Sequence, residues 1–271
     1  MYPTRPAAFA YHAPASLDEA LDLLAGDDVR PLAGGHSLLP AMKLRLAAPG
    51  MLVDLGGLSG LDGISREGDR VAVGALARHA AVAASDVVRQ ACPVLAQAAA
   101  SIGDRQVRNR GTIGGSLAHA DPGADYPTVV AALGGTIVAT GKGGEREIPA
   151  ADFFTGVFTT ALAPGELITS VRVPAVQRAV YLKHRHPASG YAVVGVAAVA
   201  TDGEVRLAVG GVAGVPATVG VPLDGAAQAA APAIAESVEA VIGDTYASPE
   251  YRLHLAGVLA RRAVEALPAQ E

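Results

Sequence analysis

The residues best suited to chemistry in this chain lie in two glycine-containing turns, and the first spans residues 32–39. A bound diphosphate needs backbone that no Cβ covers, together with several N–H donors that point toward it. The glycine pair would leave that room, the helix start that follows adds free amides and partial positive charge, and Ser37 adds a hydroxyl. Taken alone, the pair is better explained by an ordinary tight turn, and the Gly-x-Gly-x-x-Gly pattern is absent. The segment reads Leu32, Ala33, Gly34, Gly35, His36, Ser37, Leu38 and Leu39.

The second turn combines another glycine pair with hydroxyl side chains and ends at a carboxylate, Asp125. Hydroxyl groups beside glycines suit a phosphate, and a carboxylate suits ribose hydroxyls. The alternative is an irregular surface loop in which Asp121-Pro122 begins a turn. Two such turns in one chain favour a phosphate site divided between them, but the residues by themselves leave both possibilities open. Its core reads Gly111, Thr112, Ile113, Gly114, Gly115 and Ser116.

Short strands and helices are expected to carry these turns. Ser16 and Glu19 form a capping box that predicts a helix, which Gly26 should end. An alanine-rich helical segment over 77–102 must break before Pro93, which suits a first helical position. Residues 103–125 show little helical periodicity and predict a long irregular segment, a type that is usually functional when it is ordered. Strands are predicted over 29–32, 51–55, 70–74, 136–140, 145–148 and 167–173, with a short helix over 38–44.

A new pattern begins near residues 174–178, where we place a domain boundary. Three antiparallel strands are predicted there, over 181–184, 191–201 and 204–210, the last two joined at Asp202-Gly203. Two helices follow. The first should present Ile234, Val238, Val241 and Ile242 on one face, and the second begins after Ser248-Pro249 with Tyr251, Leu255, Val258 and Leu259 on one face.

Composition excludes several classes of protein. Apolar residues make up 51% of the chain and charged residues 17%, which argues against disorder. A net charge of −5 gives no electrostatic footprint for nucleic acid. The single cysteine, Cys92, excludes a disulfide framework and a cysteine-ligated cluster, and the seven histidines do not have metal-ligand spacing. No apolar run is long enough to span a membrane. We therefore expect a soluble cytoplasmic protein that holds no metal.

The two turns and their neighbours strongly resemble the FAD-binding medium subunit of molybdenum hydroxylases of the carbon monoxide dehydrogenase and xanthine dehydrogenase type. The resemblance runs from near residue 1 to past residue 210. Its stretches are Ala33 to Pro40 with Met42 to Arg45, Arg108 to Pro122, Leu162 to Ile168, and Tyr181 to Arg185.

This resemblance implies an α+β chain with two domains. Residues 1–175 would form an FAD-binding domain of the vanillyl-alcohol-oxidase (PCMH) type, made of two α/β subdomains over about 1–55 and 56–175 with FAD between them. Residues 176–271 would form a smaller α+β domain, a three-stranded antiparallel sheet with helices.

The resemblance also assigns roles to residues. The first turn would wrap the pyrophosphate, and the second would close on the phosphates and ribityl chain. Asp125 would bond ribose hydroxyls, Ile102 and Gly103 would lie beside the cofactor, and Ile168 near the adenine or flavin. Lys183 would approach the polar edge of the flavin, unless it is a surface strand lysine. Tyr191 would stack on the flavin ring, unless it simply packs in the core.

As a family member the chain would carry electrons rather than oxidise a substrate. A large molybdopterin subunit would hydroxylate the substrate, and a small iron–sulfur subunit would pass electrons to FAD here. FAD would then hand them to NAD⁺, a quinone or oxygen. Two alternatives remain open: a self-sufficient flavin oxidoreductase on the same fold, and a scaffold that never holds FAD.

Overall fold

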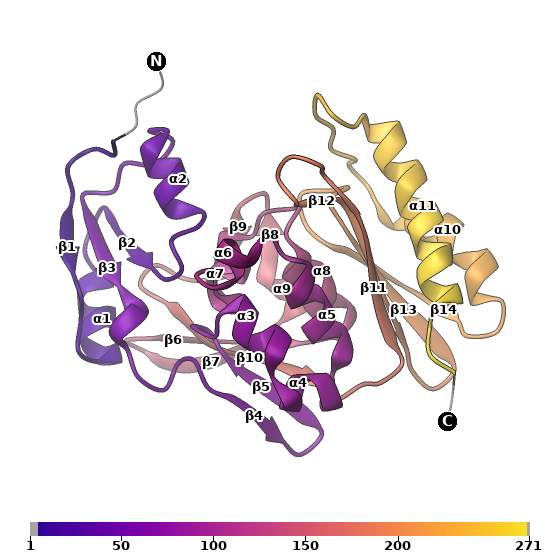
Figure 1. Cartoon of the computed structure of the whole chain (residues 1–271), viewed down its shortest axis with the longest axis horizontal. Helices are drawn as coiled ribbons and strands as arrows, with labels where there is room; N and C mark the ends of the chain where they lie inside the picture. Colours follow the sequence, from indigo (N-terminus) through magenta and orange to yellow (C-terminus); the bar gives the residue numbers. More distant parts are fainter. Residues whose placement is uncertain (1–4, 270–271) are drawn as a thin grey trace.

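The computed structural model describes residues 5–269, and the chain forms three lobes in sequence order (Figure 1). The first lobe holds a parallel sheet in the order β1-β3-β2, which needs crossover connections between its strands. The predicted helix cap is confirmed, because Ser16 Oγ accepts from the Glu19 amide at 3.2 Å, while the Glu19 carboxylate accepts from the Ala15 amide, one residue before the cap. The elements are β1 (Ala10–His12), α1 (Leu17–Leu24), β2 (Val29–Leu32), α2 (Leu38–Lys43), β3 (Met51–Asp54) and the 3₁₀ helix η1 (Leu55–Gly57).

The second lobe is built on an antiparallel sheet in the order β4-β5-β10-β6-β7. Its strands are β4 (Ile64–Glu67), β5 (Arg70–Gly74), β6 (Thr136–Gly141), β7 (Gly144–Pro149) and β10 (Leu167–Pro174), with a small hairpin of β8 (Phe154–Gly156) and β9 (Thr159–Thr160). Seven helices accompany it in the described chain: α3 (His79–Ala84), α4 (Asp86–Ala91), α5 (Pro93–Ser101), α6 (Arg105–Arg108), α7 (Ile113–His119), α8 (Asp125–Ala132) and α9 (Ala150–Phe153). The predicted break before Pro93 is confirmed, because α5 begins at that residue.

The prediction of an irregular segment over 103–125 is wrong in part. Asp104 accepts from the Val107 amide and starts α6, and Thr112 accepts from the Gly115 amide and starts α7. Capping side chains thus begin two short helices, of which α6 spans only four residues and α7 contains a glycine pair. The predicted carboxylate, Asp125, is the first residue of α8.

The third lobe has a four-stranded antiparallel sheet in the order β11-β12-β13-β14, where the sequence predicted three strands. The strand that was missed is β14, which carries only half-buried and exposed residues apart from Val221. The predicted helix face through Val238, Val241 and Ile242 is also wrong, because α10 ends at Ser237 and the Ile242 amide donates to Val212 O. The elements are β11 (Ala179–Arg185), β12 (Ala192–Ala200), β13 (Glu204–Gly210), β14 (Ala217–Pro222), α10 (Ala226–Ser237) and α11 (Pro249–Glu265).

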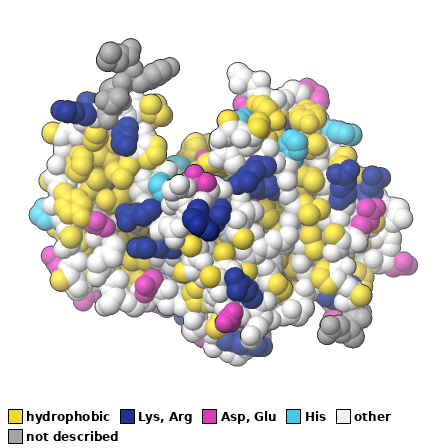
Figure 2. All heavy atoms as spheres, in the orientation of Figure 1, with side chains coloured by type: hydrophobic (Ala, Val, Ile, Leu, Met, Phe, Trp, Pro, Cys, Tyr) yellow, Lys and Arg dark blue, Asp and Glu magenta, His cyan; other side chains and the backbone are white. Residues whose placement is uncertain are grey.

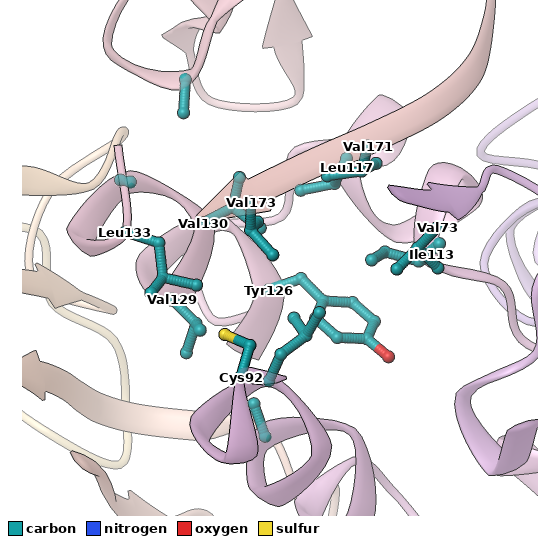
Figure 3. Close-up of a cluster of buried hydrophobic side chains, with 14 of the residues drawn as sticks. Val73, Cys92, Ile113, Leu117, Tyr126, Val129, Val130, Leu133, Val171 and Val173 are labelled. Atoms are coloured by element: carbon teal, nitrogen blue, oxygen red, sulfur yellow. The ribbon is translucent and has the colours of Figure 1, made fainter. Parts of the chain in front are cut away.

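One continuous core joins the second and third lobes. All nine residues of β12 are buried. One face of the sheet packs against α5 and α8 of the second lobe, and the other face against α10 and α11. Tyr126 lies among Cys92, Ile113 and Val129 in this core (Figure 3). Burial raises the pKa of the Cys92 thiol to about 11, so the thiol stays protonated as a small apolar group.

Candidate functional site

The two glycine turns meet in space. A Cβ built on Gly34 of the first turn would lie 2.3 Å from Arg110 O and 2.6 Å from the Gly111 Cα. One built on Gly115 would lie 3.8 Å from the Cβ of Ala33. The backbones of residues 33–34 and 110–115, some eighty positions apart in sequence, are therefore in direct contact. Figure 2 shows the surface indented between the lobe that carries α2 and the central lobe.

The first turn presents unused backbone donors. The amides of Gly34, Gly35, His36 and Ser37 donate to no acceptor within residues 5–269. Gly35 has φ +76°, a conformation that lets successive N–H groups point toward one side. Such a concave run of amides binds an anionic oxygen, so the donor chemistry of this turn fits a diphosphate.

The second turn is built differently. The amides of Ile113 and Gly114 donate to Ala77 O and Ala75 O at 3.1 and 2.9 Å, and the Gly115 amide donates to its own capping residue. A Cβ on Gly114 would lie 2.5 Å from the Cβ of Ala75. The missing side chain of Gly114 therefore makes room for Ala75. Gly35 is similar, since its Cβ would approach the side chain of Leu39 at 2.9 Å.

A buried histidine supports the second turn. The His79 amide donates to Gly111 O, and a Cβ on Gly111 would lie 2.5 Å from His79 Nε2. Burial first, and then the charges of His36 and Arg108, lower the pKa of His79 to about 4. Its Nδ1 and the hydroxyl of the neighbouring Tyr126 lack partners in the described chain. The turn thus rests on a neutral imidazole that the sequence reasoning missed.

Asp125 and Lys183 form a buried ion pair. Lys183 Nζ donates to both carboxylate oxygens of Asp125, at 2.8 and 3.0 Å, and to Ser101 O at 3.1 Å. The Tyr181 hydroxyl donates to the same carboxylate at 2.7 Å. The Lys183 side chain is only 6% exposed, so the surface-lysine alternative is wrong. The pair joins β11 of the third lobe to α8 of the second.

Two arginines that the sequence reasoning did not select hold the predicted Ile102-Gly103 segment. Arg108 donates to Ile102 O and Gly103 O at 2.9 and 3.2 Å, and Arg185 donates to Ser101 O and Gly103 O at 3.2 and 2.7 Å. With Lys183, three cations therefore fix three successive carbonyls. Both arginines lay within stretches that carried the family resemblance, which was the available signal.

Tyr191 and Ile168 lie in different settings. Tyr191 is 42% exposed, so the core-packing alternative is wrong. Partial burial and then the charge of Asp121 raise the pKa of its phenol. Ile168 is buried in the main core, on β10.

Uncompensated positive charge surrounds the second turn. Arg105 begins α6, Arg110 follows shortly after the end of that helix, and Arg78 forms a β-bridge with Thr112. None of these three arginines pairs with a carboxylate of residues 5–269. This charge complements an anionic ligand held between the turns. Across residues 5–269 there is no cluster of metal-ligating side chains and no helix long and apolar enough to cross a membrane.

Comparison with known proteins agrees with this chemistry. Residues 7–176 match the family model described as the FAD binding domain in molybdopterin dehydrogenase. The chain is 39% identical to the carbon monoxide dehydrogenase medium chain of Afipia carboxidovorans, over 98% of each chain. It is also 39% identical to the nicotine 6-hydroxylase medium subunit of Paenarthrobacter nicotinovorans, over 95% of this chain and 96% of that one.

Solved structures show the same fold. A chain of carbon monoxide dehydrogenase from Hydrogenophaga pseudoflava superposes with a TM-score of 0.88 at 37% identity, covering 97% of this chain and 98% of that one. A chain of quinoline 2-oxidoreductase from Pseudomonas putida 86 gives 0.88 at 36% identity, covering 96% and 97%. The chain therefore belongs to the family of FAD-binding subunits of molybdopterin dehydrogenases and is an oxidoreductase subunit that binds FAD.

Proposed function

We propose that this chain is the electron-relay subunit of a molybdenum hydroxylase. Its partners are a large subunit with the molybdopterin site and a small subunit with iron–sulfur clusters, and the electrons leave to an external acceptor. When bound, FAD accepts electrons singly or in pairs, which suits a station between one-electron clusters and a two-electron acceptor. Two relatives that span nearly the whole chain are named the medium chain of carbon monoxide dehydrogenase and the medium subunit of nicotine 6-hydroxylase, which supports a place in a multi-subunit enzyme.

The observation that carries the proposal is the contact between the two turns. The free amides of residues 34–37 would hold the diphosphate, and Thr112 to Ser116 would lie on its other side. Hydrogen bonds to charged groups contribute roughly 1.5–3 kcal/mol each, so a few amides suffice without a lysine. Arg78, Arg105 and Arg110 would balance the negative charge.

The remaining predicted residues take supporting roles. Ile102 and Gly103, held by Arg108 and Arg185, would form a fixed wall beside the cofactor. Lys183 acts on the site by holding Asp125, and its approach to the flavin edge stays a prediction. So do the ribose contact of Asp125, the positions of Ile168 and Tyr191 beside the ring system, the division into domains over 1–175 and 176–271, and a cytoplasmic location.

The test is purification of the affinity-tagged chain from cells that also express the proposed molybdopterin and iron–sulfur subunits. We expect a molybdopterin subunit and an iron–sulfur subunit to co-purify, with about one FAD per tagged chain. A chain that is colourless in the assembly, or that turns over a substrate without any partner, would contradict the proposal. Flavin fluorescence after acid release and mass spectrometry of the co-purified chains give the two readouts.

A further inference from the structure

The first lobe is attached to the rest of the chain more loosely than the second and third lobes are attached to each other. No strand pair and no backbone hydrogen bond joins residues 5–57 to residues 61–269. One ion pair crosses the boundary, from Lys142 Nζ to Asp22 at 2.8 Å, and both of its side chains are more than half exposed. Exposed ion pairs contribute little to stability, so this pair does not fix the position of the lobe.

The third lobe, by contrast, is held to the second by polar contacts and a shared core. The Gly211 amide donates to Pro122 O at 2.8 Å, and the buried ion pair joins β11 to α8. In the apolar core of the first lobe, the second lobe contributes a single buried residue, Leu167. Segments with few buried contacts across a boundary move at low cost in free energy. The first lobe is therefore free to move against the second, while the second and third stay together.

The segment that tethers the first lobe has the composition of a hinge. Residues 56–60 read Gly-Gly-Leu-Ser-Gly. The second lobe fixes the chain only from Leu61 onward, where Leu61 O accepts from a second-lobe amide at 2.7 Å. A Cβ on Gly57 or Gly60 would meet nothing within 4 Å, so packing does not require glycine at either position. Hinges are a few loop residues that absorb changes in φ and ψ, and residues 58–60 meet this description.

In the structure the lobe is closed, because the two turns touch at Gly34. Figure 1 shows the linker before β4 leaving the first lobe at its lower end, while the turn between β2 and α2 lies above it. A rotation about the linker would draw the first turn away from Arg110 and widen the indentation that Figure 2 shows between the lobes. A ligand that contacts both turns enters most directly when they are apart.

We infer that the first lobe is a lid, which turns about residues 58–60 to admit FAD and is held closed when the amides of residues 34–37 donate to the diphosphate. The inference rests on the proposed placement of the diphosphate between the turns. The unpaired arginines of the second lobe, Arg78, Arg105 and Arg110, attract the same group from the other side. The ligand thereby bridges two lobes that no backbone hydrogen bond joins, and binding to the closed state shifts the equilibrium toward that state.

The experiment measures the distance between the lobes in the assembled, oxidised enzyme after FAD has been removed. Spin labels are attached to p-acetylphenylalanine introduced at two exposed positions, Leu46 of the first lobe and Val157 of the second, and are read by double electron–electron resonance. A second labelled pair, Val157 and Tyr251, spans the second and third lobes and is the matched control. The probes are FAD, ADP, which carries the diphosphate without the flavin, and riboflavin, which carries the flavin without the diphosphate.

We expect FAD and ADP to shorten the mean distance between positions 46 and 157 by more than about 2 Å and to narrow its distribution. Riboflavin should change neither, and the distance in the control pair should stay constant throughout. Equal distances with and without bound FAD, or shortening by riboflavin and not by ADP, would overturn the inference and leave the proposed function intact. An assembly that takes up no FAD would refute both together.

A variant of the linker tests the position of the hinge. Gly60 has φ +81° and room for a side chain, and Gly68 in the β4-β5 turn has φ +62° and the same room. Asn tolerates this backbone conformation but restricts the movement that glycine allows. We expect Gly60→Asn to slow FAD uptake, followed by flavin fluorescence, roughly two- to fivefold, and Gly68→Asn to leave it unchanged. Equal uptake rates in the two variants would contradict a hinge at residues 58–60.

Discussion

Glycine serves three separate needs in the two turns. Gly34 allows the turns to touch, because any side chain there would overlap the backbone at Arg110. Gly35 adopts a positive φ, and Gly114 makes room for Ala75. A glycine-rich sequence is thus no direct measure of how much space a ligand receives, and substitutions at these positions should have different effects.

Gly34→Ala should lower FAD affinity by separating the turns. The added methyl group would lie 2.3 Å from Arg110 O, so the backbone of one turn must move. We expect at least about a tenfold rise in the FAD dissociation constant, the equivalent of about 1.4 kcal/mol. Equilibrium dialysis of the assembled enzyme measures this. Gly63→Ala is the control, because a Cβ there meets nothing within 4 Å. Equal affinity in the two variants would argue against a site between the turns.

His79 should make the fold less stable in weak acid. Its pKa is about 4 in the folded protein, against 6.5 for a free side chain. Below 6.5 the unfolded chain takes up a proton that the folded chain does not, so stability is present above that pH and is lost as the pH falls toward 4. The loss is about 3 kcal/mol at most. Urea denaturation at pH 7 and pH 5 measures it. In His79→Gln the difference between the two pH values should shrink, and an unchanged difference would remove this role.

Elements with strong local signals could be predicted from the sequence. The capping box at Ser16, the break at Pro93 and the hairpin of β6 and β7 follow from side-chain chemistry within a few residues. The helices α6 and α7 were missed because they are short and rich in glycine and polar residues. β14 was missed although its burial alternates, because it is a short edge strand that contains Gly220 and ends at Pro222, two residues that are typical of turns.

The parts of the site that are formed by the backbone of the two turns could be predicted from the sequence. The contacts between side chains of different helices and strands could not. The resemblance located both turns, Asp125 and Lys183. It did not reveal that the Lys183 ammonium group donates to Asp125 and to Ser101 O, because Lys183 and Asp125 lie 58 positions apart in the sequence. Nor could periodicity show that Arg185 reaches back to Gly103. Such contacts depend on how β11 packs against α5, which local sequence does not encode.

The ion pair between Lys183 of β11 and Asp125 of α8 should act mainly on the free energy of unfolding. Lys183→Met would leave the Asp125 carboxylate buried with only the hydroxyls of Tyr181 and Ser101 as donors, at a cost of about 3–5 kcal/mol. In the double variant Lys183→Met, Asp125→Asn, most of this loss should be recovered because no buried charge remains unpaired. Denaturant midpoints of the three proteins measure the coupling. Equal loss in the single and double variants would contradict this reading.

The second and third lobes should not separate into independent folding units. Tyr181, Ala197, Val199 and Ala208 of the third lobe belong to the core of the second. A fragment of residues 1–178 would expose that apolar surface and strip Asp125 of both Lys183 and Tyr181. We expect it to aggregate, as gel filtration would show. A soluble, monomeric fragment that binds FAD would contradict the single-core description.

The position of β10 has a consequence for synthesis on the ribosome. This strand fills the centre of its sheet, pairing with β5 on one side and β6 on the other, yet its residues 167–174 are made last of the five strands. Until they emerge, the nascent chain carries two unpaired strand edges, which invite association with other chains. Assembly of the centre must therefore wait for the final strand, so this sheet cannot close before residue 174 has been made.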